Sequence, residues 1–194
     1  MRIHLVYAHP LPTSFAASAC SAVYKALVGA GHEVDLLDLY QEDFEPRLSA
    51  QERARYHEAP DNADGVASHV QRLRAAEGLV LVFPTWNFGP PAILKGWMDR
   101  VLLPGVAFRL DDGNIRPALT NIRHFSVVTS YGQRGWIVRW VIGDPLRKQF
   151  MRSLRRCMHP RARTRWLPLY DMNRIGDAER RLFLERLDST YRHL

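Results

Sequence analysis

Residues 78 to 103, GLVLVFPTWNFGPPAILKGWMDRVLL, contain a complete change from one kind of regular structure to another. The first seven residues are apolar without a break, which is typical of a strand that is covered on both faces of a sheet. Pro84 ends the hydrogen-bond ladder of such a strand, and Pro90 and Pro91 open a pattern with helical spacing. The stretch therefore predicts a buried parallel strand and a helix, joined by residues 85 to 89, which belong to neither.

Strand-like and helix-like segments alternate in the same way along the whole chain. The expected strands are residues 2–8, 33–40, 78–84, 123–130 and 164–172. The expected helices are residues 15–29, 63–77, 90–103, 144–158 and 177–192. Strict alternation implies parallel strands joined by right-handed crossovers, with helices on both faces of the sheet. We therefore expect one α/β domain over residues 1–194, with a flavodoxin-like, doubly wound sheet of five parallel strands in the order 2-1-3-4-5.

Two connections in this scheme are longer than usual. Residues 40–62 include a capping box at residues 49–52, which predicts a short helix from residue 50 to about residue 58. Residues 104–122 include Asp112-Gly113, which predicts a turn. Each connection is equally compatible with a dimer interface, with a wall of a pocket and with plain surface.

Composition and cysteine content bound the class of protein. The proportions of hydrophobic residues, 46%, and charged residues, 24%, are those of an ordinary globular chain. No apolar run approaches the roughly 20 residues that a membrane-spanning helix needs, and residues 1–10 do not resemble a signal peptide. Cys20 and Cys157 are far apart and fit neither a disulfide framework nor a metal motif. We therefore expect a cytoplasmic protein without membrane insertion.

The chain is basic, with a net charge of +7 and a pI of about 9.8. Its densest basic segment is residues 147–165, in which four apolar residues recur at helical spacing: Phe150, Leu154, Cys157 and Met158. This pattern predicts an amphipathic surface helix. A nucleic-acid site would have aromatic residues among the basic ones, whereas the one aromatic residue of this helix lies on its apolar stripe. We therefore expect no nucleic-acid partner, although the positive charge would attract anionic small molecules.

In a doubly wound sheet, ligands bind beyond the carboxyl ends of the strands, near the switch point between the first and third strands. The loop after the first strand contains His9, Thr13, Ser14 and Phe15. Ser14 is suited to cap the next helix, whose free first-turn amides and dipole favour a phosphate. A plain helix cap explains this segment equally well.

The loop after the third strand consists of Pro84, Thr85, Trp86, Asn87 and Phe88. Two large rings at a strand-to-helix turn suit a flat ligand, which would stack against them while loop amides bond its polar edge. The alternative is that the rings fill the end of the sheet as part of the core.

The loop after the fourth strand contains Thr129, Ser130, Tyr131, Gly132 and Trp136. It repeats the combination of hydroxyls, glycine and rings, and a glycine allows a backbone N–H to approach a ligand closely. Three such loops at one sheet edge argue more strongly for a ligand than any single loop. The chain has no Walker lysine motif, no GxGxxG and no histidine spacing typical of a metal site, so we expect no metal.

These segments resemble a known family, the flavodoxin-like NAD(P)H:quinone oxidoreductases of the DT-diaphorase and modulator-of-drug-activity types. The resemblance rests on Ala8-His9-Pro10 with Thr13-Ser14-Phe15, on the run from Pro84 to Val101, and on Gly105-x-Ala107-Phe108. It extends over roughly residues 1 to 145. It implies a flavin across the three loops, FMN or FAD, with NAD(P)H as the hydride donor and a quinone or similar small molecule as the acceptor. It also implies a homodimer.

The resemblance assigns two groups of contact residues. Those expected at the phosphate end of the flavin are His9, Thr13, Ser14 and Phe15. Those expected at the isoalloxazine are Pro84, Thr85, Trp86, Asn87, Phe88, Thr129, Ser130 and Gly132.

The chain also departs from the family pattern. Ala16 replaces a common Asn, which slightly favours FMN over FAD. Tyr131 occupies a usual glycine position and Trp136 lies near the position of a catalytic Tyr, so both are expected as pocket residues and catalytic candidates. Two other functions remain open: a flavin-binding electron carrier, and an ancillary regulatory subunit of a potassium-efflux system.

Overall fold

The fold is built on a sheet of five parallel strands, described in a computed structural model for residues 1–111 and 113–194. The strands are β1 (Arg2–Tyr7), β2 (Glu33–Asp38), β3 (Gly78–Pro84), β6 (His124–Ser130) and β7 (Arg163–Leu169). Their order is β2-β1-β3-β6-β7, and every neighbouring pair is parallel. Counted within this sheet alone, the order is 2-1-3-4-5, which confirms the prediction.

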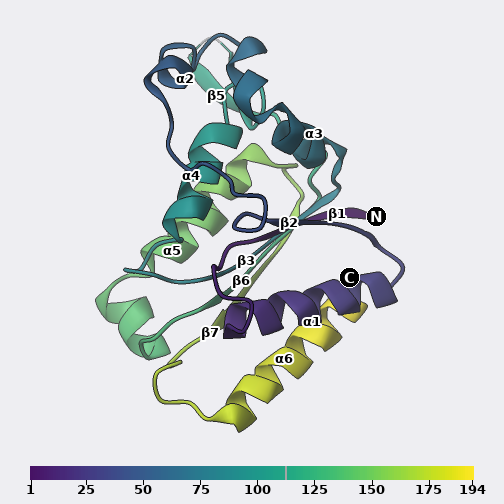
Figure 1. Ribbon diagram of the computed structural model, residues 1–194, viewed down its shortest axis with the longest axis vertical. Helices are drawn as coiled ribbons and strands as arrows, with labels where there is room; N and C mark the ends of the chain where they lie inside the picture. The colour runs from purple at the N-terminus through teal and green to yellow at the C-terminus, as the bar shows by residue number, and fades with distance from the viewer. Residues whose placement is uncertain (112) are drawn as a thin grey trace.

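Helices cover both faces of the sheet (Figure 1). On one face, α1 (Phe15–Gly29) and α6 (Asp177–Arg192) lie side by side. On the other face lie α3 (Ala67–Ala75), α4 (Ala92–Val101) and α5 (Pro145–Lys148). The connections include three shorter helical segments: α2 (Ala50–Ala54), η1 (Asp61–Val66) and η2 (Ile137–Val141). Within the described residues, no helix has the length and apolar character needed to cross a bilayer.

Strand β3 explains why the central run of the sequence has no polar interruption. Leu79, Leu81 and Phe83 point into the core beneath α3 and α4, whereas Val80 and Val82 point into the core beneath α1 and α6. All seven residues of the strand are buried. Because the strand buries both faces, alternation of polar and apolar residues is absent, as expected for the middle of a parallel sheet.

The helix expected at residues 144–158 has the correct extent but not a uniform geometry. Only α5 is α-helical; it continues as the π-helical η3 (Gln149–Ser153) and the 3-10 helix η4 (Leu154–Cys157). The predicted apolar stripe is nevertheless directed inward, since Phe150, Leu154 and Met158 are buried.

The two long connections each contain a short element. The capping box at Ser49 is present, although α2 ends at Ala54 rather than near residue 58. The second connection forms an antiparallel hairpin of β4 (Phe108–Asp111) and β5 (Asn114–Pro117), which the sequence analysis did not predict. Of the predicted turn, Asp112 lies outside the described residues, and Gly113 has a φ of 77°, which suits glycine.

Candidate functional site

The loop after β1 has the geometry expected of a helix N-terminus. The Ser14 hydroxyl accepts a hydrogen bond from the Ala17 amide at 3.1 Å, which confirms Ser14 as the N-cap of α1. The ring nitrogen Nδ1 of His9 accepts a hydrogen bond from the Leu11 amide at 3.0 Å and so shapes the loop. The amide of Phe15, the first helical residue, has no acceptor within the helix. This end of α1 therefore presents backbone donors together with the positive end of the helix dipole.

The loop after β3 closes in a tight two-residue turn. Trp86 and Gly89 exchange two backbone hydrogen bonds, of 3.0 and 2.9 Å. Between them, Asn87 and Phe88 both have positive φ, 49° and 59°. Such a conformation costs of order 1–3 kcal/mol for a residue other than glycine, and it is retained mainly at functional positions. Within residues 1–111 and 113–194, the Asn87 and Phe88 amides donate to no protein acceptor.

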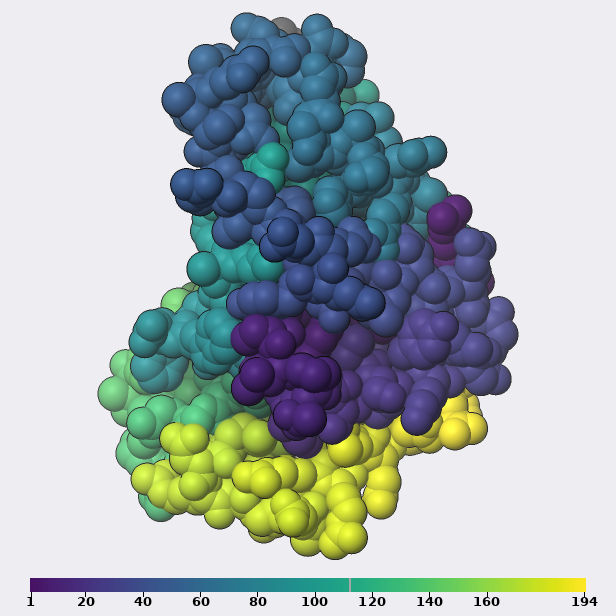
Figure 2. All heavy atoms as spheres, in the orientation of Figure 1, coloured from purple at the N-terminus to yellow at the C-terminus, as the bar shows by residue number. Residues whose placement is uncertain are grey.

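Side-chain and backbone contacts join the three loops into one edge. The rings of His9 and Trp86 meet edge to face with their centroids 5.8 Å apart, which joins the first loop to the second. The hydroxyls of Thr85 and Thr129 are hydrogen bonded at 3.0 Å. The Thr85 amide also donates to the Ser130 carbonyl at 2.8 Å, which joins the second loop to the third. In Figure 2 the dark purple first loop borders both teal atoms and yellow-green atoms from distant parts of the chain.

The two catalytic candidates lie in different environments. Tyr131 is 1% exposed, and its hydroxyl donates to Asp144 Oδ1 at 2.9 Å. Burial, followed by the nearby Asp144 charge, raises the pKa of Tyr131, so its hydroxyl stays protonated. Trp136 is exposed and immediately precedes η2. Within the third loop, Tyr131 is thus buried, where it hydrogen bonds to Asp144, whereas Trp136 lies on the surface.

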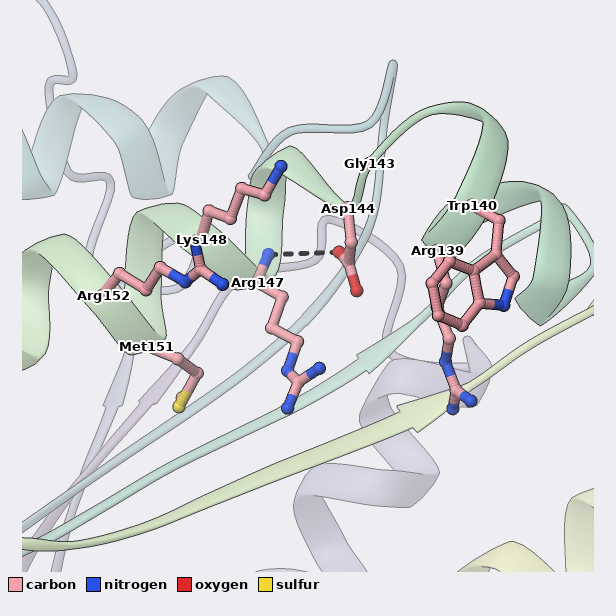
Figure 3. A pocket seen from close by; sticks show the side chains of 8 residues that line it. All are labelled: Arg139, Trp140, Gly143, Asp144, Arg147, Lys148, Met151 and Arg152. Carbon is pink, nitrogen blue, oxygen red and sulfur yellow. Dashed lines mark hydrogen bonds between the residues drawn. The ribbon is translucent and has the colours of Figure 1, made fainter.

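The hollows of the surface are unequal. At the carboxyl ends of the strands, the cavity between Phe15, Thr129 and Phe183 measures only about 10 Å³. A ligand bound at this edge therefore lies on the outside of the three loops rather than inside the protomer. A much larger hollow, of about 690 Å³, lies beside η2 and α5 (Figure 3).

This larger hollow was not expected from the sequence. Its basic residues belong to the segment that we interpreted as an ordinary amphipathic helix. The sequence does contain one signal, the Gly143-Asp144-Pro145 break, which separates η2 from α5 and brings a carboxylate among these residues. Within the part of the chain that the structure describes, no group of three or more His, Cys, Asp or Glu side chains is arranged to hold a metal ion.

A five-stranded parallel sheet in the order 2-1-3-4-5, with helices on both faces, defines the class of doubly wound α/β proteins. Residues 1–139 match the model of a protein family described as having a flavodoxin-like fold, and the chain belongs to this family.

The chain is also similar to individual proteins. The chain is 35% identical to mouse ribosyldihydronicotinamide dehydrogenase [quinone] over 126 residues, 55% of this chain and 53% of the mouse protein. It thus spans about half the length of this and related mammalian proteins. An uncharacterized NAD(P)H oxidoreductase of Escherichia coli is 31% identical over 140 residues, 70% of each chain.

Nearly the whole chain is also covered by solved structures, including the following two. A Streptococcus mutans protein has a TM-score of 0.87 at 27% identity, with all of both chains covered. An NAD(P)H:quinone oxidoreductase from Methanothermobacter marburgensis has a TM-score of 0.81 at 25% identity, covering 99% of this chain and 94% of that one.

Proposed function

We propose that this protein is a flavin-dependent NAD(P)H oxidoreductase that passes a hydride from NAD(P)H, by way of a bound flavin, to a quinone or similar small electrophilic acceptor. The observation that carries the proposal is the meeting of three loops with free backbone donors at the switch-point edge of the sheet. The names of the mouse, Escherichia coli and Methanothermobacter relatives support the same chemistry.

The first loop fits the phosphate end of a flavin. The first-turn amides of α1 and the helix dipole favour an anion, and the Thr13 hydroxyl is exposed beside them. Ser14 keeps its hydroxyl on the Ala17 amide and so orients this turn. We propose that His9, Thr13, Ser14 and Phe15 hold this phosphate. FMN is favoured, because Ala16 stands where the family that the chain resembles commonly has Asn, and FAD is the alternative.

The second and third loops fit the flat ring system. Trp86 presents an exposed ring, and the Asn87 and Phe88 amides have no acceptor among the protein residues that the structure describes, so this loop offers both an apolar contact and two donors. We propose that Pro84 and Thr85 fix this loop and that Thr129, Ser130 and Gly132 approach the ring system from the other side. When bound, the flavin would supply the two-electron chemistry. The loop donors would favour the reduced, anionic form of the ring.

The two catalytic candidates receive different roles in this proposal. Tyr131 acts as a positioning residue, because its hydroxyl is committed to Asp144 and its side chain is buried. Trp136 is exposed next to the third loop, where we propose that it shields the reacting ring from water.

We further propose that the protein is a homodimer. A flavin on the outside of the loops has only one protein wall in a single protomer, and a partner would supply the second. The hairpin offers an apolar surface for association, since its cross-strand neighbours Leu110 and Ile115 are both exposed. A cytoplasmic location is also proposed, because both cysteines are free thiols.

The test is steady-state turnover of the flavin-loaded protein. We expect consumption of NAD(P)H that depends on a soluble quinone, with the parallel double-reciprocal lines of a ping-pong cycle. Leu182→Ala, which changes an exposed residue of α6 away from the loops, should leave the rate unchanged. Flavin binding without turnover would favour an electron carrier, and the absence of both would contradict the proposal.

A further inference from the structure

The large hollow beside η2 combines features that the proposed flavin chemistry does not use. It lies between η2 and the α5–η3 segment, next to the third loop (Figure 3). The six lining residues that matter here are Arg139, Trp140, Asp144, Arg147, Lys148 and Arg152. Its volume, about 690 Å³, falls within the range of small-molecule sites.

The charge of this hollow favours a multiply charged anion. Four basic side chains surround one carboxylate, so these residues carry a formal charge of 4 − 1 = +3. Within residues 1–111 and 113–194, Arg147, Lys148 and Arg152 form no ion pair. The Arg139 guanidinium instead lies over the Tyr170 ring, 5.2 Å from its centroid. Unpaired cations around a concavity concentrate anionic ligands, and phosphates most of all.

The Asp144 carboxylate favours a ligand that carries a hydrogen-bond donor. It is only 6% exposed, and its Oδ1 accepts hydrogen bonds from the Tyr131 hydroxyl and the Arg147 amide. Its Oδ2 is buried and has no partner among the described residues. Figure 3 shows Asp144 between the side chains of Arg139 and Arg147, whose guanidinium ends point the same way. A buried carboxylate oxygen without a partner is rare in proteins, and an amino or hydroxyl group of a ligand would satisfy it.

The backbone holds Asp144 in an unusual conformation. Gly143 and Asp144 both have positive φ, 79° and 46°. These two successive left-handed residues follow η2, at a conformational cost for the aspartate, and the Asp144 side chain lines the hollow while its Oδ1 caps α5 at the Arg147 amide.

Trp140 supplies a flat apolar surface. Its side chain is 83% exposed at the edge of the hollow. An indole with this exposure offers a stacking surface for a nucleobase, which is worth roughly 1–3 kcal/mol per base in single-stranded nucleic-acid sites, so stacking here is expected to raise nucleotide affinity.

We propose that this hollow binds the phosphorylated adenosine half of NADPH. The phosphates contact Arg147, Lys148 and Arg152, the base stacks on Trp140, and an amino or hydroxyl group donates to Asp144 Oδ2. The proposal rests on the proposed function, since it assigns the hydride donor of that reaction. Because NADPH carries one phosphate more than NADH, the protein should use NADPH in preference.

The test is direct binding of a nucleotide fragment, without turnover. The adenosine bisphosphate that NADPH contains and NADH lacks is titrated into the full chain by calorimetry and tryptophan fluorescence, alongside adenosine monophosphate and inorganic phosphate. We expect the bisphosphate to bind at least about tenfold more tightly than the monophosphate, a difference of about 1.4 kcal/mol. We also expect it to quench fluorescence in the wild type but much less in Trp140→Ala.

Matched variants separate a site from general positive charge. Lys148→Ala with Arg152→Ala should weaken bisphosphate binding by about tenfold or more, whereas Arg156→Ala, an exposed arginine of η4 outside the hollow, should not. Equal weakening by both, or phosphate binding as tightly as the bisphosphate, would overturn the proposal.

The remaining outcomes distinguish this proposal from the proposed function. Bisphosphate binding with the expected variant effects, but without turnover, would keep the nucleotide site and contradict the oxidoreductase. If the protein turns over NADPH and NADH equally well and does not bind the bisphosphate, the oxidoreductase is supported and the nucleotide site is contradicted.

Discussion

Trp86 is the residue on which the proposed ring contact most depends. It is 41% exposed, and within residues 1–111 and 113–194 its one ring contact is the edge-to-face contact with His9, so the fold does not need it as a core residue. We expect Trp86→Ala to raise the dissociation constant for flavin by about tenfold, the effect of losing about 1.4 kcal/mol of stacking, and so to lower the flavin content of the purified protein. The flavin-to-protein ratio is read from visible and ultraviolet absorption.

Trp140→Ala is the matched control for this prediction. It removes an even more exposed indole from the same sheet edge, but outside the three loops. Its flavin content should equal that of the wild type. If Trp86→Ala also keeps its full flavin content, the Trp86 ring serves packing alone.

The Asp35 carboxylate is hydrogen bonded to two side chains from other elements, His4 and Arg72. Its Oδ2 lies 2.8 Å from His4 Nδ1, and Arg72 donates to both of its oxygens at 2.8 to 3.0 Å. The hydrogen bond with His4, followed by those from Arg72, holds the pKa of Asp35 well below its usual range, against the effect of burial.

This pKa shift predicts a pH-dependent loss of stability. The folded-state pKa of Asp35 is lower than its unfolded-state pKa of about 4. Its contribution to the free energy of unfolding is therefore fully present above the unfolded-state pKa, and it is lost as the pH falls through the folded-state pKa. Asp35→Asn should therefore lower the free energy of unfolding by about 1–3 kcal/mol at neutral pH, and by less below about pH 4. Urea unfolding at both pH values measures this. Glu33→Gln, in an exposed pair with Arg2, should change little, and an Asp35→Asn effect that is independent of pH would contradict the linkage.

At the scale of elements, Gly96 determines how closely α4 approaches the connection after β2. A Cβ at this position would overlap the backbone of Pro46. Gly96→Ala should therefore lower the free energy of unfolding by about 1–3 kcal/mol, because neither backbone segment can move without disturbing the core. Gly29→Ala, at the end of α1, is the control, since its Cβ would meet nothing within 4 Å. Urea unfolding of both variants measures the difference, and equal effects would show that the close approach is not stabilising.

The sequence predicts elements well where one local rule decides them. The run of β3 and the prolines after it establish a buried strand, a loop and a helix, and the structure contains all three. The hairpin was missed because β4 and β5 lie largely in solvent and carry no clear alternation. Residues 144–158 were predicted as one regular helix, because the spacing of their apolar residues does not reveal the π-helical and 3-10 segments.

The same reasoning applies to the sites. The three loops were predicted to lie together because the carboxyl ends of parallel strands lie at the same edge of the sheet, independently of the side chains in the loops. The basic hollow was not predicted, because it depends on how the chain turns at Gly143 and Asp144 between η2 and α5, where the positive φ of both residues is not revealed by the helical spacing of the segment.

At the scale of the whole molecule, the hairpin tests the proposed homodimer. Leu110 and Ile115 form an exposed apolar pair, so Leu110→Ser with Ile115→Ser should convert a dimer to a monomer and weaken flavin retention. Light scattering after size exclusion measures the mass. Leu182→Ser, at an exposed position of α6, should leave the dimer intact. A wild-type monomer that retains its flavin would contradict the proposal.

The central claim is that a flavin binds across the loops after β1, β3 and β6. The most direct measurement is a titration of FMN into the flavin-free protein, followed through the fluorescence of FMN itself. We expect saturable quenching with one FMN per chain, strongly weakened in Trp86→Ala and unchanged in Trp140→Ala. FMN fluorescence that stays constant as protein is added, with the same result for FAD, would contradict it.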